Sequence, residues 1–287
     1  MTATPGVWIA SGQPVTPPPL TPEVPEPHAA GVELLDIISF AIDNAPRSQQ
    51  VQIGPSELGT PCDWCLVHKL AGAEERHDGS SAWLPAIGTA VHAWLDEVFC
   101  EADLQVFKGV HSDDELPEPR WWRETLVDVG EVNGTPVTGH ADLYDGLTGD
   151  VTDWKIVGAS TIKAAKANGP SDTYRRQAHL YGRGFTRRGL PVRNVRIAYL
   201  PRTSVNLRDA YLWTEPYDEL VALAALARAD AYARALAAVG LEAMAPSLTR
   251  AAGCYSCNAY PSADGTAPAR PGDWRNKPLD PNNAFAA

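Results

Sequence analysis

The chain has 287 residues, a hydrophobic fraction of 44% and a charged fraction of 21%. These values are typical of globular proteins and exclude a wholly disordered, collagenous or coiled-coil chain. The 35 acidic side chains outnumber the 24 Lys and Arg side chains, so the net charge is −11. This charge excludes a polybasic coat for nucleic acid, whereas an enzyme with a local basic groove is compatible with it.

The two ends differ in composition from the rest of the chain. Residues 1–30 are rich in Pro and predict a disordered arm, because Pro resists both helix and sheet. Residues 262–287 carry few large apolar side chains and predict a flexible tail. We expect a single domain over residues 31–261.

Export and membrane insertion are not expected. The first Lys or Arg is Arg47, so the basic start of a secretory signal is missing. The most apolar later stretch, residues 220–239, is interrupted by three charged side chains and predicts a soluble helix. We therefore expect a cytoplasmic protein without membrane contact.

Hydrophobic periodicity predicts helices and strands between these ends. Apolar side chains at three- and four-residue steps predict helices, and alternating ones predict strands. In chain order we predict helices at 32–43 and 85–102, strands at 121–129, 136–144 and 151–157, a helix at 171–188, strands at 192–200 and 207–213, and a helix from 216 to about 239. This order predicts an α/β sandwich with a mixed sheet.

Two neighbouring strands predict a divalent-metal site. Asp142 lies near the end of the second strand, and Asp153 and Lys155 lie on the third. Residues two apart on a strand project to the same side, and a hairpin brings Asp142 near them. Adjacent carboxylates repel and call for a cation such as Mg²⁺ or Mn²⁺, while a lysine can polarise water or stabilise phosphate charge. Two turn aspartates with a solvated lysine are the alternative that so short a motif leaves open.

Two of the predicted helices carry further polar side chains. His92 lies on the mostly apolar helix at 85–102, where a buried histidine is the plain alternative to a ligand. Gln177 and Tyr181 are four residues apart on the helix at 171–188 and share one of its faces. Arg175 and Arg176 make this helix locally basic, which is typical either of a solvated face or of a phosphate-contacting one.

These residues occur in the order and on the elements of a known nuclease family. The motifs are His92, Gly139-x-x-Asp142, Asp153-x-Lys155 and Gln177-x-x-x-Tyr181, and together they resemble the RecB-like branch of the PD-(D/E)XK nucleases over residues 50–260. The resemblance implies an αβββαβ core with a mixed central sheet flanked by helices. It implies that His92, Asp142 and Asp153 bind a catalytic Mg²⁺ or Mn²⁺, and that Lys155 positions or activates water. Gln177 and Tyr181 would fix the DNA strand and the site geometry.

The resemblance implies a deoxyribonuclease. We expect it to act as an exonuclease, more than an endonuclease, at linear or single-stranded DNA ends in recombination, repair or replication. It would work in a bacterium or a phage-infected cell, with a separate helicase or recombinase as a candidate partner. The alternative is an inactive DNA-end-binding or scaffold protein that retains the fold. Glu124 is a further candidate acid, for which an exposed strand residue is the favoured interpretation.

Four of the five cysteines form two Cys-x-x-Cys pairs, Cys62/Cys65 and Cys254/Cys257. In a reducing compartment this spacing suggests a metal before a disulfide. The run Ser56-x-Leu58-x-x-x-Cys62 resembles the start of the CRISPR-associated type of iron–sulfur exonuclease, which implies a [4Fe–4S] cluster and is the interpretation we favour. The third late cysteine of that family is missing here, and four thiolates also suit tetrahedral Zn²⁺. Either metal would staple the start of the domain to its end.

Overall fold

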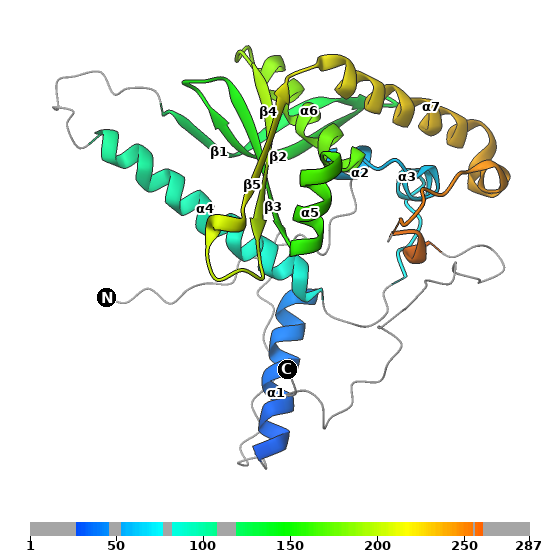
Figure 1. Cartoon of the computed structure of the whole chain (residues 1–287). Coiled ribbons are helices and arrows are strands. Elements are labelled where there is room, and N and C mark those ends of the chain that lie inside the picture. Colours follow the sequence, from blue (N-terminus) through cyan, green and yellow to red (C-terminus); the bar gives the residue numbers. More distant parts are fainter. Residues whose placement is uncertain (1–26, 46–52, 77–81, 108–118, 255, 261–287) are drawn as a thin grey trace.

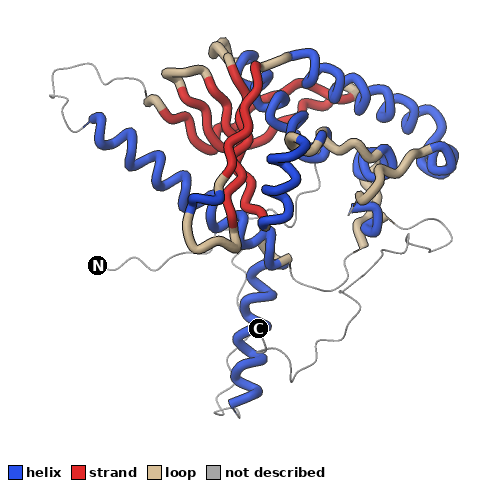
Figure 2. The backbone as a smooth tube through the Cα atoms, in the orientation of Figure 1, coloured by secondary structure: helices blue, strands red, loops and turns tan. Residues whose placement is uncertain are grey.

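The computed structural model describes residues 27–45, 53–76, 82–107, 119–254 and 256–260. A five-stranded mixed sheet with helices packed around it forms the body of the molecule (Figures 1 and 2). The strands are β1 (Trp121–Val132), β2 (Thr135–Asp145), β3 (Asp150–Val157), β4 (Asn194–Pro201) and β5 (Tyr211–Pro216). The helices are α1 (Pro27–Asp43), α2 (Pro55–Leu58), α3 (Asp63–Leu70), α4 (Trp83–Phe107), α5 (Ala159–Asn168), α6 (Asp172–Arg187) and α7 (Glu219–Met244), with 3₁₀ turns at Leu207–Asp209, Ala245–Ser247 and Ser256–Ala259.

The strands lie in the sheet in chain order, β1-β2-β3-β4-β5. Neighbours are antiparallel except β3 and β4, which are parallel. A parallel pair needs a crossover connection, and α5 and α6 supply it. The β2–β3 ladder consists of three residue pairs and ends at Leu143 and Thr152. Asp142, one residue before Leu143, and Asp153, one residue after Thr152, are therefore next to this last pair and lie at the same point of the sheet.

Helix α6 packs closely on its neighbours because two of its glycines leave room, each on a different side of the helix. A Cβ atom on Gly184 would lie 2.5 Å from a side-chain carbon of Val127, and one on Gly182 would lie 2.7 Å from the ring of Tyr217. The core between this helix and the strands consists of Val127, Val129, Leu180, Phe185, Val195 and Ile197. The close approach fixes the distance between α6 and the strands that carry the predicted site.

Most of the predicted elements are confirmed, with shifted boundaries. The strand predicted at 207–213 is wrong at its start, because Leu207–Asp209 forms a 3₁₀ turn and β5 begins at Tyr211. Asn206 caps that turn by accepting a hydrogen bond from the backbone N–H of Arg208. Helices α3 and α5 were not predicted, because both are short and α5 buries only Ile162 and Ala165.

The predicted ends of the chain are tested only in part. Helix α1 begins at Pro27, so the last residues of the expected arm are helical, and Pro is tolerated in a first helical turn. The remainder of the arm and the tail lie outside the described residues, and the single domain stays a prediction. Among the described residues, no helix combines the length and hydropathy that a membrane crossing needs.

Candidate active site

Three side chains from three different elements converge beside the central strands. His92 comes from α4, Glu124 from β1 and Asp142 from β2. His92 Nδ1 lies 3.2 Å from Asp142 Oδ1 and 3.9 Å from Glu124 Oε1. One potential ligand atom of each lies within 4.8 Å of those of the other two. An imidazole and two carboxylates at this spacing can hold a divalent cation.

Sequence reasoning undervalued Glu124. The pairs Arg123–Leu143 and Thr125–Ala141 place it opposite Asp142 across the β1–β2 ladder. Its backbone φ is 38°, which is rare for a residue with a side chain. Since directly opposed side chains on neighbouring strands are close, the register of this hairpin was the signal that could have identified it.

Asp153 and Lys155 form an ion pair next to this group. Asp153 is 1% exposed, and its Oδ2 atom lies 2.7 Å from Lys155 Nζ. Apart from this ammonium, Oδ2 has no hydrogen-bond partner among the described residues. Burial raises the pKa of Asp153 to about 6, although Lys155 opposes the rise. A buried carboxylate that is costly to ionise favours a cation near it.

Asp153 stands slightly apart from the three converging side chains. The predicted ligand set joined it with His92 and Asp142, whereas the tight group contains Glu124 in its place. Asp142 is nevertheless hydrogen-bonded to the strand that carries Asp153, since the Trp154 backbone N–H donates to Asp142 Oδ2 at 2.7 Å. The charge of Asp153 still acts on the group, since it raises the pKa of His92.

The ammonium of Lys155 is held from three sides. Besides Asp153, it donates to Gln177 Oε1 at 2.9 Å, and it lies 4.7 Å from the ring centre of Tyr174. Gln177 Nε2 in turn donates to the Tyr181 hydroxyl at 3.4 Å. The predicted pair Gln177 and Tyr181 therefore lies behind the lysine on α6. Tyr174 was not predicted, and its position one turn before Gln177 is the sequence signal for it.

The pKa values around His92 show how strongly these groups interact. Burial lowers the pKa of His92, but its hydrogen bond to Asp142 and the charges of Asp142, Asp153 and Glu124 outweigh burial and raise it. Burial and the neighbouring Asp142 raise the pKa of Glu124. The carboxylates of this site thus repel one another, and an added positive charge would stabilise them.

The two predicted DNA-binding arginines are already paired with carboxylates. Arg175 Nε lies 2.6 Å from Glu215 Oε1, and Arg176 lies 3.2 Å from Asp172. Arg176 also donates to the carbonyl oxygens of Gly59 and Thr60 at 3.4 and 3.5 Å. Their contact with DNA remains a prediction.

The four predicted metal cysteines form a second cluster, remote in sequence but close in space. The Sγ atoms of Cys62 and Cys257 are 3.4 Å apart, those of Cys65 and Cys254 are 3.6 Å apart, and those of Cys65 and Cys257 are 3.7 Å apart. All four thiols are free. Burial and neighbouring thiols raise the pKa of Cys257 to about 12.

Hydrogen bonds and an ion pair around the cysteines join residues 63–76 to α7 and to the last described residues. Trp64 Nε1 donates to the Tyr260 carbonyl at 2.8 Å, and the Arg76 N–H donates to the Ala259 carbonyl at 2.9 Å. Asp63, between the first two cysteines, pairs with Arg228 of α7 at 2.6 Å. The cluster therefore lies at a junction of α3, α7 and the last described turn.

No model of a known protein family matches the chain, and no curated protein matches it. Among solved structures it is similar to an alkaline exonuclease (LHK-Exo) from Laribacter hongkongensis, with 13% identity over 70% of this chain and 95% of the other, at a TM-score of 0.42. The same exonuclease in complex with dAMP gives 13% identity, the same coverage and a TM-score of 0.41. At this level of likeness, function has to be argued from the side chains of this chain.

Proposed function

We propose that the chain is a divalent-metal-dependent nuclease that hydrolyses phosphodiester bonds in DNA. The observation that carries this is the convergence of His92, Glu124 and Asp142 beside the buried ion pair of Asp153 and Lys155. Carboxylates, an imidazole and a held lysine are the groups that metal-assisted phosphoryl hydrolysis needs.

The donor set fits Mg²⁺ or Mn²⁺. Asp142, Glu124 and His92 would hold the ion, and Asp153, the ligand that the motif resemblance implies, lies near enough for its charge to act on His92. Hard oxygen donors with one imidazole suit these ions better than soft metals. When bound, the ion would polarise the scissile phosphate and lower the pKa of a bound water.

The remaining steps belong to the side chains of the chain. Lys155, presented by Gln177 and Asp153, is placed to stabilise negative charge that develops on the phosphate or to orient the attacking water. Asp153, whose Oδ2 atom lies 2.7 Å from Lys155 Nζ, keeps that ammonium in position. The neutral ring of His92, which faces two carboxylates, would supply the nitrogen ligand of the ion.

The substrate and setting follow the resemblance of the motifs. We place the activity at linear or single-stranded DNA ends, as an exonuclease in recombination, repair or replication. The protein would act in the cytoplasm of a bacterium or phage-infected cell, alongside a separate helicase or recombinase. The alternative is an inactive protein that binds DNA ends, and absence of cleavage in the following test would point to it.

The decisive experiment compares the wild type with Lys155→Ala on end-labelled linear and circular DNA, with Mg²⁺, with Mn²⁺ and with EDTA. We expect metal-dependent loss of linear DNA, slowed about 10²- to 10³-fold by the substitution, as for loss of one charge-stabilising donor. Lys69→Ala is the matched control, because it removes a lysine that is also ion-paired, to Glu75 at 2.9 Å, but lies on α3. Absence of cleavage by folded, metal-loaded wild type would reject the nuclease.

For the cysteine cluster we propose a single tetrahedral ion, Zn²⁺, in place of the [4Fe–4S] cluster favoured from sequence. Four thiolates about 2.3 Å from one Zn²⁺ stand about 3.8 Å apart, close to the 3.4, 3.6 and 3.7 Å between the sulfur atoms here. In a [4Fe–4S] cluster each thiolate binds a different iron, so its sulfurs must stand further apart. The spacing thus favours one ion with a structural role.

Elemental analysis of protein purified without oxygen tests this assignment. We expect about one zinc and no iron per chain, with zinc released on modification of the thiols. Brown protein with about four irons per chain would restore the iron–sulfur interpretation. Protein with neither metal would leave the cluster as reduced thiols.

A further inference from the structure

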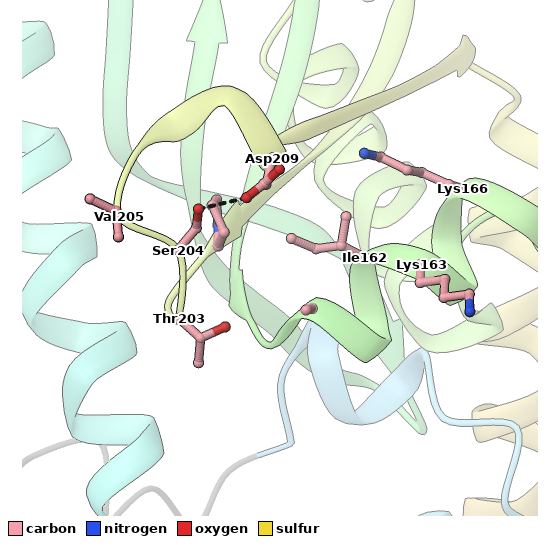
Figure 3. A pocket seen from close by; sticks show the side chains of 9 residues that line it. Ile162, Lys163, Lys166, Thr203, Ser204, Val205 and Asp209 are labelled. Carbon is pink, nitrogen blue, oxygen red and sulfur yellow. Dashed lines mark hydrogen bonds between the residues drawn. The ribbon is translucent and has the colours of Figure 1, made fainter.

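A cavity of about 540 Å³ lies between α5 and the loop that joins β4 to β5 (Figure 3). One wall is a single face of α5, formed by Ala159, Ile162, Lys163 and Lys166. The other wall comes from Pro201 and from loop residues Thr203, Ser204, Val205 and Asp209. None of these residues has a role in the site described above. The volume lies within the usual range of small-molecule sites, roughly 300–1,000 Å³.

The cavity begins where the strands of the candidate active site end. Lys155 pairs in register with Tyr199, and two residues further on Val157 pairs with Pro201, the last pair of the β3–β4 ladder. Two residues of strand span about 7 Å. Stacked bases along one DNA strand are about 3.4 Å apart. The register thus places the cavity wall at Pro201 within the spacing of a few nucleotides from Lys155.

The walls suit a flat organic ring with a polar edge. Ile162 is 4% exposed and forms an apolar floor, flanked by Ala159 and Pro201. At one end the Ser204 hydroxyl donates to Asp209 Oδ2 at 2.6 Å. Figure 3 shows Lys166 reaching toward that same end, whereas the ammonium of Lys163 points away from it. Mostly apolar walls with a few converging polar groups are typical of ligand sites.

The charges decide between a phosphate and a base as the occupant. Two lysines and one aspartate line the cavity, but Asp209 lies at the polar end, where its carboxylate would repel a phosphate, and only the Lys166 ammonium reaches toward that end. A nucleobase is uncharged, has two flat apolar faces, and presents hydrogen-bond donors and acceptors at its edge. The walls match this combination of properties, and they match a phosphate poorly.

We infer that the cavity between α5 and the β4–β5 loop receives an unstacked nucleobase of the substrate strand, next to the phosphodiester that is cut. The inference rests on the proposed nuclease function and deepens it. Bases in single strands or frayed ends can leave the stack easily, whereas unpairing a base inside a duplex costs free energy. The site therefore assigns the enzyme a preference for single-stranded or frayed DNA.

Filling the cavity tests the inference. Ala159 and Ala167 are both exposed residues of α5, but only Ala159 lines the cavity. Ala159→Leu and its matched control Ala167→Leu are each combined with Lys155→Ala, so that cleavage does not disturb binding. The probe is a fluorescein-labelled single-stranded oligonucleotide without added Mg²⁺ or Mn²⁺, compared with a series in which one base at a time is replaced by an abasic residue.

We expect one abasic position to weaken binding to Lys155→Ala by about tenfold, as for the loss of one bound base. Ala159→Leu should weaken binding of the intact oligonucleotide by a similar factor and remove the effect of that abasic position, because the two changes delete the same contact. Ala167→Leu should leave the position effect in place. Asp209→Asn, a change in an exposed loop, should alter which base is preferred at the sensitive position.

Two results would overturn the inference. One is an abasic series without a sensitive position, and the other is a sensitive position that survives unchanged in Ala159→Leu and Asp209→Asn. Failure of the nuclease proposal is distinguishable from both. If the wild type does not cleave DNA but Ala159→Leu removes the sensitive position in the binding series, the base site stands and the nuclease proposal is rejected. If the wild type cleaves DNA but the series has no sensitive position, only the base site is rejected.

Discussion

At the scale of single residues, strain and charge coincide at Glu124. Its φ of 38° lies in a region that few non-glycine residues adopt, and such a conformation costs of order 1–3 kcal/mol. The same residue lies beside His92 and Asp142, where like charge adds to the cost. Residues held against both costs cluster at functional sites, which is why we include Glu124 among the metal ligands.

Glu124→Gln should slow DNA cleavage and raise the Mg²⁺ concentration needed for half-maximal rate by about 10- to 100-fold, as for loss of a group that tunes a metal site. Unfolding by urea should show no loss of stability, because the substitution removes a repulsive charge. Glu131→Gln, on an exposed residue of the same strand, is the control. An unchanged Mg²⁺ dependence would remove Glu124 from the metal site.

Gln177 is a positioning residue that acts through Lys155. Replacing Gln177 by Ala leaves the ammonium without its 2.9 Å acceptor, so we expect kcat to fall between about 10- and 100-fold with little change in KM. Tyr181→Phe removes only the long 3.4 Å contact and should cost within about threefold. Steady-state kinetics of both variants check this order, and equal losses would contradict it.

At the scale of elements, α6 connects the site to the far edge of the sheet. One face carries Tyr174, Gln177 and Tyr181 beneath Lys155. Elsewhere on the helix, His179 is fully buried and contacts Glu215 of β5 through Nε2 at 2.6 Å. Its Nδ1 accepts the Asp218 N–H at 3.2 Å, so the neutral ring satisfies both contacts by donating from Nε2. The position of α6 therefore depends on a histidine that must stay neutral.

The neutral His179 predicts sensitivity to acid. Burial lowers its pKa, and the hydrogen bond to Glu215 only partly opposes this. The unfolded chain then binds more protons than the folded one below about pH 6.5, so stability is present above that pH and is lost as pH falls further. For one proton the slope is at most about 1.4 kcal/mol per pH unit.

Urea unfolding of the wild type and His179→Gln at several pH values between 5 and 8 measures this slope. We expect the variant to be less stable at pH 7 and its free energy of unfolding to depend less on pH between 7 and 5. Parallel curves for the two proteins would assign the acid sensitivity elsewhere, with His68, whose pKa burial also lowers, as the next residue to replace.

At the scale of the molecule, the cysteine cluster joins segments from opposite ends of the described chain. Its thiol contacts connect residues 189 to 195 positions apart. An ion at this point would close most of the domain into one loop, and closing a long loop removes more entropy from the unfolded chain than closing a short one. The metal of the cluster would thus stabilise the whole domain and leave chemistry to the other site.

Cys254→Ser should lower the free energy of unfolding by up to about 5 kcal/mol, the loop-closure value for a crosslink across so long a segment. Cys100→Ser is the matched control, because Cys100 lies on α4, outside the cluster. Thermal unfolding of both variants, with and without a strong chelator, measures the effect. A chelator that destabilises Cys254→Ser as much as the wild type would place the stabilising ion elsewhere.

Local patterns were enough to predict the strands β1 to β4 and the helices α4, α6 and α7, whereas His92, Asp142, Asp153, Lys155, Gln177 and Tyr181 became candidate site residues through the resemblance of their motifs to a nuclease family. Periodicity and motif spacing are properties of neighbouring residues, and the side chains of one strand or one helix turn report them directly. The two Cys-x-x-Cys pairs were recognisable for the same reason.

Contacts between distant segments could be decided only by the tertiary structure. Glu124 joined the site through the β1–β2 register and an unusual backbone angle, and neither is visible in local periodicity. Arg175 was bound to Glu215 of β5, although as a sequence feature it looked like a free cation. The spacing of the four sulfurs and the cavity beside α5 likewise depend on how helices and loops pack, because distances between groups far apart in the chain are set by the core that lies between them.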